Sequence, residues 1–400
     1  MKKLFVLLLL PLFMGCFHEH YQYNIKIEAG NMDRSAGPVY VDVLLPAVES
    51  NTPACIMDGK VKIPGQLENL GGGMARIWWT CPAMNAGQIK EYTIFFPYKC
   101  AKPGYQWAME ADTAATLTFN NIPVIKYLYA PFNQQNFVNT QKPYHHVYAP
   151  DGGEIITKGD SGGLYPHHRG IFFGYTTVTV GDSLYNSWYC NGGEYTAHNS
   201  FVTQMTGAVY GGHVVSIDWM NRQGEPYALE TRTVRAFKLP DSSILIDYAI
   251  NLDSFGDSVL LSGDRQHGGV HFRAAQYVAD HDSATRFIRH EQWSAVPADS
   301  EYNADDFRNV PWDAMQFSID GHDYIVVYMS DPVNPKPADF SERKYGRFGE
   351  FFPYMLTPEQ PLAAHYRFWI LNGHDINREQ IEKQYQALVN PIKISIYKYD

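Results

Sequence analysis

One segment of the chain alternates apolar side chains with groups that transfer protons or bind anions. If residues 267–273 form a strand, His267 and Arg273 point to one side, while Val270 and Phe272 point to the other. Such a strand would bury its apolar side against a core. The spacing therefore predicts a polar groove lined by the opposite side of this strand.

Asp264 precedes His267 by three residues, and Gly269 follows two residues later. A nearby carboxylate can hold one tautomer of an imidazole and raise its basicity. The glycine would leave room for a substrate to approach the backbone. His168, which precedes an apolar strand elsewhere in the chain, is the candidate third member. We therefore predict an acid–base site formed by His168, Asp264 and His267.

The histidines offer little sign of a metal site. On a strand, His167 and His168 would face opposite ways, so we expect at least one of them to be structural. His267 and His271 would lie about 13 Å apart at roughly 3.3 Å per residue, too far apart to bind one ion. The sequence has no nucleophile elbow, phosphate-binding loop or helical zinc-protease motif. We expect neither a metal nor another cofactor.

Several polar segments together carry a family resemblance. They are KPYHHVYAPDGG, PHHRGIFFGY, GDRQHGGVHFR, PWDAMQFSIDG, DPVNP and RKYGRFGEFFPY. On these segments, residues 120–375 resemble the PmoA-like family of exported bacterial proteins. The architecture of that family is similar to the galactose-mutarotase-like supersandwich, a fold of sugar epimerases, polysaccharide lyases and some glycosidases. The resemblance implies a carbohydrate substrate, by analogy of fold alone. It does not imply the methane oxygenation of the family's name, because we find neither membrane-spanning runs nor a copper-type ligand set.

We hypothesise an exported enzyme that acts on a glycoside or an oligosaccharide, acidic and sulfated ones included. Cleavage of a glycosidic bond needs a proton donor and a second group that serves as base, nucleophile or stabiliser. His168, Asp264 and His267 would supply these groups. Arginine binds planar oxyanions, and aromatic rings stack on sugar faces. The residues expected to bind the substrate are His145, His167, Arg169, Arg273, Trp312, Arg343 and Tyr345.

Other functions remain open at this point. Elimination fits as well as hydrolysis, with a histidine as base and an arginine that neutralises an acidic sugar. A non-catalytic glycan-binding lipoprotein would use the same aromatic and arginine side chains without requiring Asp264 or His267. A purely structural envelope protein is least favoured, because it would not need clustered histidine and arginine.

The composition favours a folded protein rich in sheet. Of 400 residues, 45% are hydrophobic and 18% charged, and the 28 Tyr, 22 Phe and 8 Trp suit strands. The formal net charge of −10 argues against a broad nucleic-acid interface, which needs clustered Lys and Arg. No protein partner is inferred.

Apolar–polar alternation predicts an all-β fold with two sandwiches. Residues 22–100 hold short strands broken by turns, typical of a small immunoglobulin-like sandwich, and residues 101–121 are expected to be a linker. Residues 122–400 are expected to form a large antiparallel sandwich, the supersandwich that the resemblance implies. The clearest helical spacing covers residues 376–389, and a strand is expected over residues 392–399.

The first 16 residues are typical of an export signal. Lys2 and Lys3 precede an apolar run over residues 4–13 that is too short to span a bilayer. Gly15 and Cys16 resemble a bacterial lipobox, so we expect Cys16 to be lipidated. The folded body would then lie in water at a membrane surface, in the periplasm or at the cell surface. An ordinary secretory signal with an incidental cysteine is the alternative.

Overall fold

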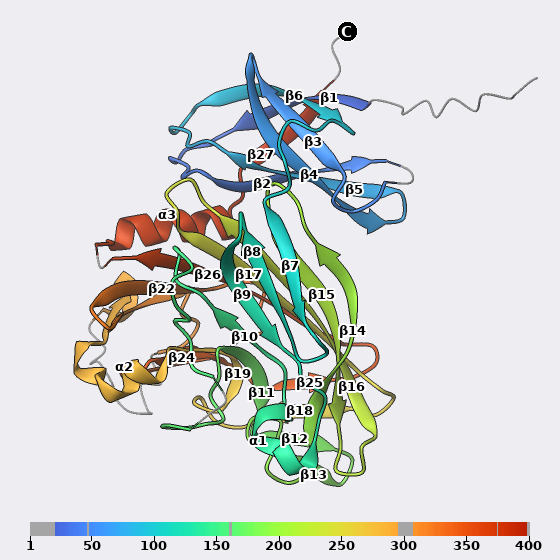
Figure 1. The fold of residues 1–400 in the computed structure, drawn as a ribbon, viewed down its shortest axis with the longest axis vertical. Helices are drawn as coiled ribbons and strands as arrows, with labels where there is room; N and C mark the ends of the chain where they lie inside the picture. Colours follow the sequence, from blue (N-terminus) through green and yellow to red (C-terminus); the bar gives the residue numbers. More distant parts are fainter. Residues whose placement is uncertain (1–20, 46–47, 160–161, 295–306, 374, 398–400) are drawn as a thin grey trace, which may run out of the picture.

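The computed structural model describes residues 21–45, 48–159, 162–294, 307–373 and 375–397. Antiparallel strands dominate these residues and form four sheets (Figure 1), which confirms the all-β sandwich fold. The predicted signal peptide, with Cys16, lies outside the described residues, so export and lipidation stay predictions. Within the described residues, no helix is both long and apolar enough to cross a membrane.

Seven strands form the N-terminal sheet. They are β1 (Tyr21–Glu28), β2 (Gly37–Leu44), β3 (Pro53–Asp58), β4 (Val61–Gly71), β5 (Met74–Cys81), β6 (Ile89–Phe96) and β27 (Lys393–Tyr397), in the order β2-β5-β4-β3-β6-β1-β27. Alternate apolar residues, such as Ile25 and Ile27 of β1 and Val43 of β2, share one buried core. The edge strands β2 and β27 contact each other, so the sheet curls around that core.

The small sandwich predicted over residues 22–100 is therefore not complete by itself. The strand expected near the end of the chain is confirmed as β27, and it pairs antiparallel with β1, where Ile394 lies opposite Ile27. The predicted assignment of residues 122–400 to one sandwich is wrong at its C-terminal end. The reason is that apolar residues of β27 extend the core of the N-terminal sheet.

Two eight-stranded sheets pack face to face in the second unit (Figure 1). The first contains, in order, β23 (Asp339–Arg343), β24 (Arg347–Phe351), β19 (Gly268–Arg273), β11 (Ile171–Tyr175), β10 (Tyr144–Val147), β9 (Ile122–Leu128), β8 (Ala114–Phe119) and β7 (Tyr105–Glu110). The second contains β14 (Tyr195–Met205), β15 (Gly211–Met220), β16 (Pro226–Lys238), β17 (Ile244–Ser254), β26 (Leu362–Asn372), β22 (His322–Ser330), β21 (Trp312–Ile319) and β20 (Arg286–Arg289). A smaller sheet contains β13 (Ser183–Tyr185), β12 (Thr177–Val180), β18 (Val259–Ser262) and β25 (Tyr354–Leu356).

The linker predicted over residues 101–121 is wrong, because this segment forms the hairpin of β7 and β8. The two strands pair antiparallel around a turn at residues 111–113. Tyr105 and Leu117 point into the core of the second unit, where both are fully buried. The hairpin therefore belongs to the first eight-stranded sheet, at the edge nearest the N-terminal unit in sequence.

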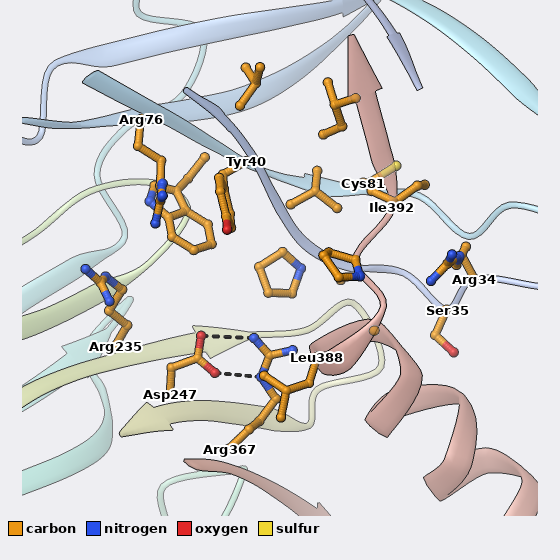
Figure 2. Close-up of a pocket in the computed structure, with 18 of the residues that line it drawn as sticks. Arg34, Ser35, Tyr40, Arg76, Cys81, Arg235, Asp247, Arg367, Leu388 and Ile392 are labelled. Carbon is orange, nitrogen blue, oxygen red and sulfur yellow. Dashed lines mark hydrogen bonds and ion pairs between the residues drawn. The ribbon is translucent and has the colours of Figure 1, made fainter. Parts of the chain in front are cut away.

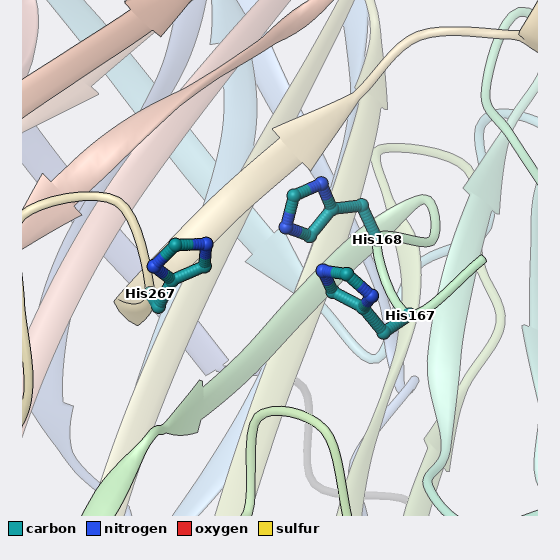
Figure 3. A group of neighbouring side chains, drawn as sticks. All are labelled: His167, His168 and His267. Atoms are coloured by element: carbon teal, nitrogen blue, oxygen red, sulfur yellow. The ribbon is translucent and has the colours of Figure 1, made fainter. Parts of the chain in front are cut away.

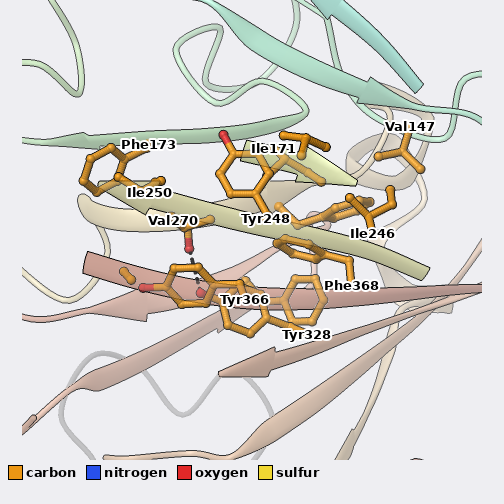
Figure 4. Close-up of a cluster of buried hydrophobic side chains, with 14 of the residues drawn as sticks. Val147, Ile171, Phe173, Ile246, Tyr248, Ile250, Val270, Tyr328, Tyr366 and Phe368 are labelled. Carbon is orange, nitrogen blue, oxygen red and sulfur yellow. Dashed lines mark hydrogen bonds between the residues drawn. The ribbon is translucent and has the colours of Figure 1, made fainter. Parts of the chain in front are cut away.

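Side chains from both eight-stranded sheets meet in the core of the second unit (Figure 4). Tyr248 and Phe368 come from β17 and β26, while Phe173 and Val270 come from β11 and β19 of the opposite sheet. Tyr328 of β22 donates its hydroxyl to the carbonyl of Val270 at 3.1 Å. This bond satisfies a buried hydroxyl and fixes β19 against the opposite sheet.

The described helices are short, apart from α3 (Arg378–Val389); α1 spans Phe137–Thr140 and α2 spans Gln276–Asp280. Asn377 and Gln380 form a capping box at the start of α3, with each side chain accepting the other's backbone N–H. Ile381 is fully buried on its inner face. The helix predicted over residues 376–389 is confirmed, and it leads directly into β27.

Substitution of Phe368 tests how much the packing between the two sheets contributes to stability, because its side chain is fully buried between them. We expect Phe368→Ala to lower the free energy of unfolding by about 3–5 kcal/mol, through lost burial and the cavity left behind. The matched control is Phe255→Ala, since Phe255 is 50% exposed, and its effect is expected to stay within about 0.5 kcal/mol. Urea unfolding measures both, and equal losses would contradict this account of the core.

Candidate metal centre

Two turns bring three histidines together. His167 and His168 lie just before β11, and His267 lies just before β19, its antiparallel neighbour in the sheet. Ligand nitrogens of the three imidazoles lie within 4.8 Å of one another (Figure 3). Histidines from distant parts of the sequence thus share one site on the first eight-stranded sheet.

The segment that carries His167 and His168 is a turn. The backbone N–H of His168 donates to the carbonyl of Tyr165 at 3.0 Å, and Tyr165 and Gly170 both have positive φ angles, of 53° and 47°. A Cβ on Gly170 would lie 2.0 Å from the carbonyl oxygen of His145, so this turn needs glycine there. The strand assumed for His167 and His168 is wrong, because they lie in a turn and both rings approach His267, so the expectation that at least one of them is structural stays a prediction.

Several imidazole nitrogens at this site are buried without a hydrogen bond. Among the described residues, neither nitrogen of His168 has a partner, nor has Nε2 of His167. Buried polar atoms are nearly always satisfied, so such atoms point to a missing ligand. Burial lowers the pKa of His167 to about 3, and burial followed by the charge of Arg347 lowers the pKa of His168 well below its ordinary value. Both rings are thus neutral near pH 7 and keep a lone pair for a metal ion.

His267 is oriented by a carboxylate. Its Nδ1 lies 2.9 and 3.0 Å from the two carboxylate oxygens of Asp264, and the backbone N–H of Gln266 donates to the same carboxylate at 2.8 Å. A neutral imidazole that donates from Nδ1 to this carboxylate has its lone pair on Nε2. A histidine held in this way by a carboxylate is typical of metal ligands in proteins.

Aromatic rings enclose the three histidines on their inner side. Trp188 is fully buried, with its ring centroid 5.6 Å from that of His168 and 6.0 Å from that of His267. The Tyr189 ring lies 4.4 Å from His167 and 5.6 Å from His267. These rings exclude water from the nitrogens on that side.

The site opens on its other side. The side chain of His267 is 25% exposed, and Tyr165, whose ring lies 5.5 Å from His168, is 43% exposed. Tyr345 is half-buried and nearly parallel to His168, at 6.2 Å between centroids. A molecule that approaches the histidines from solvent would therefore pass between tyrosine rings.

Sequence reasoning missed Trp188, Tyr189 and Arg347 as parts of this site. A signal for the first two was present in Asn186, since asparagine side chains often cap turns. Its carbonyl oxygen accepts the backbone N–H groups of Trp188 and Tyr189, at 3.1 and 2.8 Å, and this turn aims both rings at the histidines.

Arg347 is fully buried beneath the site and connects its parts. Its Nε donates to the hydroxyl of Tyr345 at 2.9 Å, and Nη2 donates to that of Ser341 at 3.0 Å. Its Nη1 donates to the carbonyl of Gln266 at 3.1 Å and to Nδ1 of His271 at 2.8 Å. Arg347 thus ties the turn of His267 to strands β19, β23 and β24.

The open polar groove expected along residues 267–273 is not there. β19 begins after His267, and His271 and Arg273 on its polar side are fully buried beneath neighbouring side chains. Gly269 makes room for another strand instead of a substrate. Its φ is 80°, and a Cβ there would lie 2.0 Å from the carbonyl oxygen of Glu350 in β24.

The prediction that Arg169 and Arg273 bind substrate is wrong, because both side chains are fully buried. Nε of Arg169 donates to the carbonyl of Pro166 at 3.0 Å, which stabilises the histidine turn from below. Nη1 of Arg273 donates to the carbonyls of Ala274, at 3.0 Å, and Tyr345. Both guanidinium groups hold loop backbone in place.

His145 and Trp312 lie away from the site, so their predicted contacts with substrate are wrong. His145 is buried in β10, with Nε2 at 2.8 Å from Nε2 of His213 in the opposite sheet. Trp312 is buried in β21 beneath α3, where its indole N–H donates to Glu382 at 2.8 Å. Both side chains are covered by a neighbouring element that their local sequence does not reveal.

The remaining predicted site residues are Arg343 and five residues near the histidine centre. Arg343 lies at the end of β23, where Nη1 donates to the carbonyl of Glu342 at 2.6 Å, and its contact with substrate stays a prediction. The predicted residues that meet around the histidine centre are His167, His168, Asp264, His267 and Tyr345.

Comparison with known proteins finds a match to a family whose function is not known. A sequence profile described as a family of unknown function, DUF6807, matches residues 114–386, a range that contains the whole histidine centre. No curated protein matches the chain. The resemblance to the PmoA-like family stays a hypothesis.

Arg347→Lys tests how far the centre depends on one buried guanidinium. Lysine keeps the charge, but it cannot reach the four acceptors of a planar fork. We expect the free energy of unfolding to fall by about 2–4 kcal/mol, because buried acceptors lose their donors. Arg286→Lys, at an exposed position, is the control, with an expected change within about 0.5 kcal/mol. Denaturant unfolding compares them, and an Arg347→Lys protein as stable as the control would refute the dependence.

Proposed function

The chain belongs to DUF6807, a family of unknown function, and we propose that it is a metal-dependent hydrolase that acts on saccharides at its histidine centre. The observation that carries this proposal is the convergence of His167, His168 and His267, together with the buried ring nitrogens of His167 and His168 that have no hydrogen-bond partner. Three protein ligands with one open position are typical of catalytic zinc sites.

The proposed ion is zinc or another first-row divalent cation that imidazole ligands suit. The earlier expectation of no metal considered His267 with His271 on one strand. The ligand set proposed now combines His267 with two histidines from another turn, which spacing within one strand cannot reveal. Asp264 supports it, because a carboxylate behind a ligating histidine fixes the ring and strengthens binding.

The residues around the ligands favour hydrolysis of a neutral saccharide bond. A bound ion of this kind supplies Lewis acidity and a water of lowered pKa. The rings of Tyr165 and Tyr345 at the opening offer faces on which a sugar can stack. Elimination from an acidic sugar is less favoured, because two of the three arginines expected to neutralise it, Arg169 and Arg273, are buried, and only Arg343 is partly exposed.

Two parts of the proposal rest wholly or mainly on the sequence. Export and attachment through Cys16 rest on residues 1–16. The carbohydrate class rests on the family resemblance together with the tyrosines at the opening. A glycan-binding protein without catalysis remains the competing function, but it gives no reason for buried imidazoles without hydrogen bonds.

Metal binding is the first test. We expect the untagged, metal-stripped protein to take up about one zinc ion per chain. We expect His168→Ala and His267→Ala to abolish this uptake, and Asp264→Asn to weaken affinity by about 10–100-fold. His322→Ala is the matched control, because this side chain is 69% exposed on β22. Competition titrations and elemental analysis after dialysis measure the outcome. Wild-type protein that takes up no metal, or a His267→Ala protein that binds it equally, would overturn the centre.

Activity is the second test. The purified protein is assayed on neutral, acidic and sulfated oligosaccharides, with and without a chelator. We expect hydrolysis of a neutral substrate that the chelator abolishes and zinc restores. We expect His267→Ala to reduce turnover by about 10²–10⁴-fold, the range for loss of a group that acts on the reacting atoms. Chelator-resistant turnover would exclude the metal mechanism, and binding without turnover would establish the glycan-binding alternative.

A further inference from the structure

A pocket of about 660 Å³ lies between the N-terminal sheet and the second unit (Figure 2). Tyr40 of β2 lines it on one side, and Asp247 of β17 and Arg367 of β26 line it on the other. Leu388 of α3 and Ile392, just before β27, complete it. Its volume is in the range of small-molecule sites, about 300–1,000 Å³. It shares no described residue with the histidine centre.

Most of the charged side chains that line this pocket are paired with one another, whereas Arg34 donates to the backbone carbonyls of Ala29 and Asn390. Asp247 accepts Nε and Nη2 of Arg367 at 2.6 and 3.0 Å on the side of the second unit. Beside Tyr40 on the N-terminal sheet, Asp42 accepts Nε and Nη2 of Arg76 at 2.7 and 2.9 Å. The other pairs at this pocket are His365 with Asp331 and Arg235 with Glu68. An anionic ligand would have to displace these carboxylates, whereas hydroxyl groups can bond to the outer edges of intact pairs. The pocket therefore suits a neutral ligand with many hydroxyls.

The wall that the N-terminal sheet forms combines the Asp42–Arg76 pair with apolar side chains and the ring of Tyr40. Tyr40 is 39% exposed, and the guanidinium of Arg76 covers one face of its ring at 3.8 Å. In Figure 2 Tyr40 stands between Arg76 and the side of the pocket formed by Leu388 and Ile392. The ring of Trp78, which also lines the pocket, lies 4.7 Å from that of Tyr40, so the two rings form an aromatic part of this wall. An apolar ring face opposite a row of paired charges matches the two sides of a pyranose, its C–H face and its hydroxyl edge.

We propose that this pocket binds one or two units of a neutral saccharide. The ring stacks on Tyr40, and its hydroxyls bond to the Asp247–Arg367 pair. Because the pocket lies between the two units, a bound saccharide contacts both of them. The proposal uses the pocket's own residues and does not depend on the metal centre.

Calorimetric titration of the full chain with maltose, cellobiose, lactose and galactose tests this, with glucuronate and galacturonate as charged counterparts. We expect at least one neutral sugar to bind with a Kd below about 1 mM. We expect Tyr40→Ala to weaken that binding at least tenfold and Tyr40→Phe to preserve it. Ala387→Trp, which fills the pocket from α3, is expected to abolish it.

Controls separate this pocket from the proposed active site. Tyr98→Ala removes a tyrosine of similar exposure, 40%, outside the pocket, and is expected to bind sugar like the wild type. His267→Ala is expected to keep the pocket's affinity even where it loses metal and turnover. Absence of binding by all neutral sugars, binding of the charged sugars alone, or unchanged affinity in Tyr40→Ala would each overturn the proposal.

Discussion

The histidine centre depends on the buried guanidinium of Arg347. Its charge is stabilised by neutral acceptors that belong to separate segments, among them Gln266 in the turn of His267, His271 in β19 and Tyr345 at the opening. A buried cation is costly unless its hydrogen bonds are satisfied. The hydrogen bonds to Arg347 therefore fix the position of each acceptor. The position of His267 follows from this requirement, although Arg347 itself does not reach the proposed metal.

Much of the fold could be predicted from local patterns. Alternation of apolar residues, as at Ile25 and Ile27, indicates strands, and Asn377 with Gln380 marks the start of the long helix. These signals lie within a few residues of the sequence, so they can be recognised without knowing which other elements pack against them. The hairpin over residues 105–119 is not expected from the sequence, because it follows the turn-forming residues Pro103 and Gly104 and therefore resembles a linker. The pairing of β27 with β1 could not be predicted either, because nothing local specifies which edge a strand will join.

The candidate site, too, has a part that could be predicted from local sequence and a part that could not. Asp264 and His267 are three residues apart, and their contact could be anticipated because a turn suffices to bring them together. His168 joins them through the pairing of β11 with β19, a long-range contact. Burial was the main source of error. Arg273 and Trp312 belong to residue types common in binding sites, but their exposure is decided by elements far away in sequence, which cover both of them.

The pairing of β27 with β1 has a consequence for biosynthesis. A ribosome makes β1 near the beginning and β27 near the end, so the edge of β1 stays unpaired while nearly the whole chain is synthesised. Unpaired strand edges are prone to join the wrong partner. The N-terminal sheet can therefore receive its seventh strand only after the residues of the second unit have been made. Pairing of β27 with β1 thus joins two segments that are made far apart in time, on either side of the second unit.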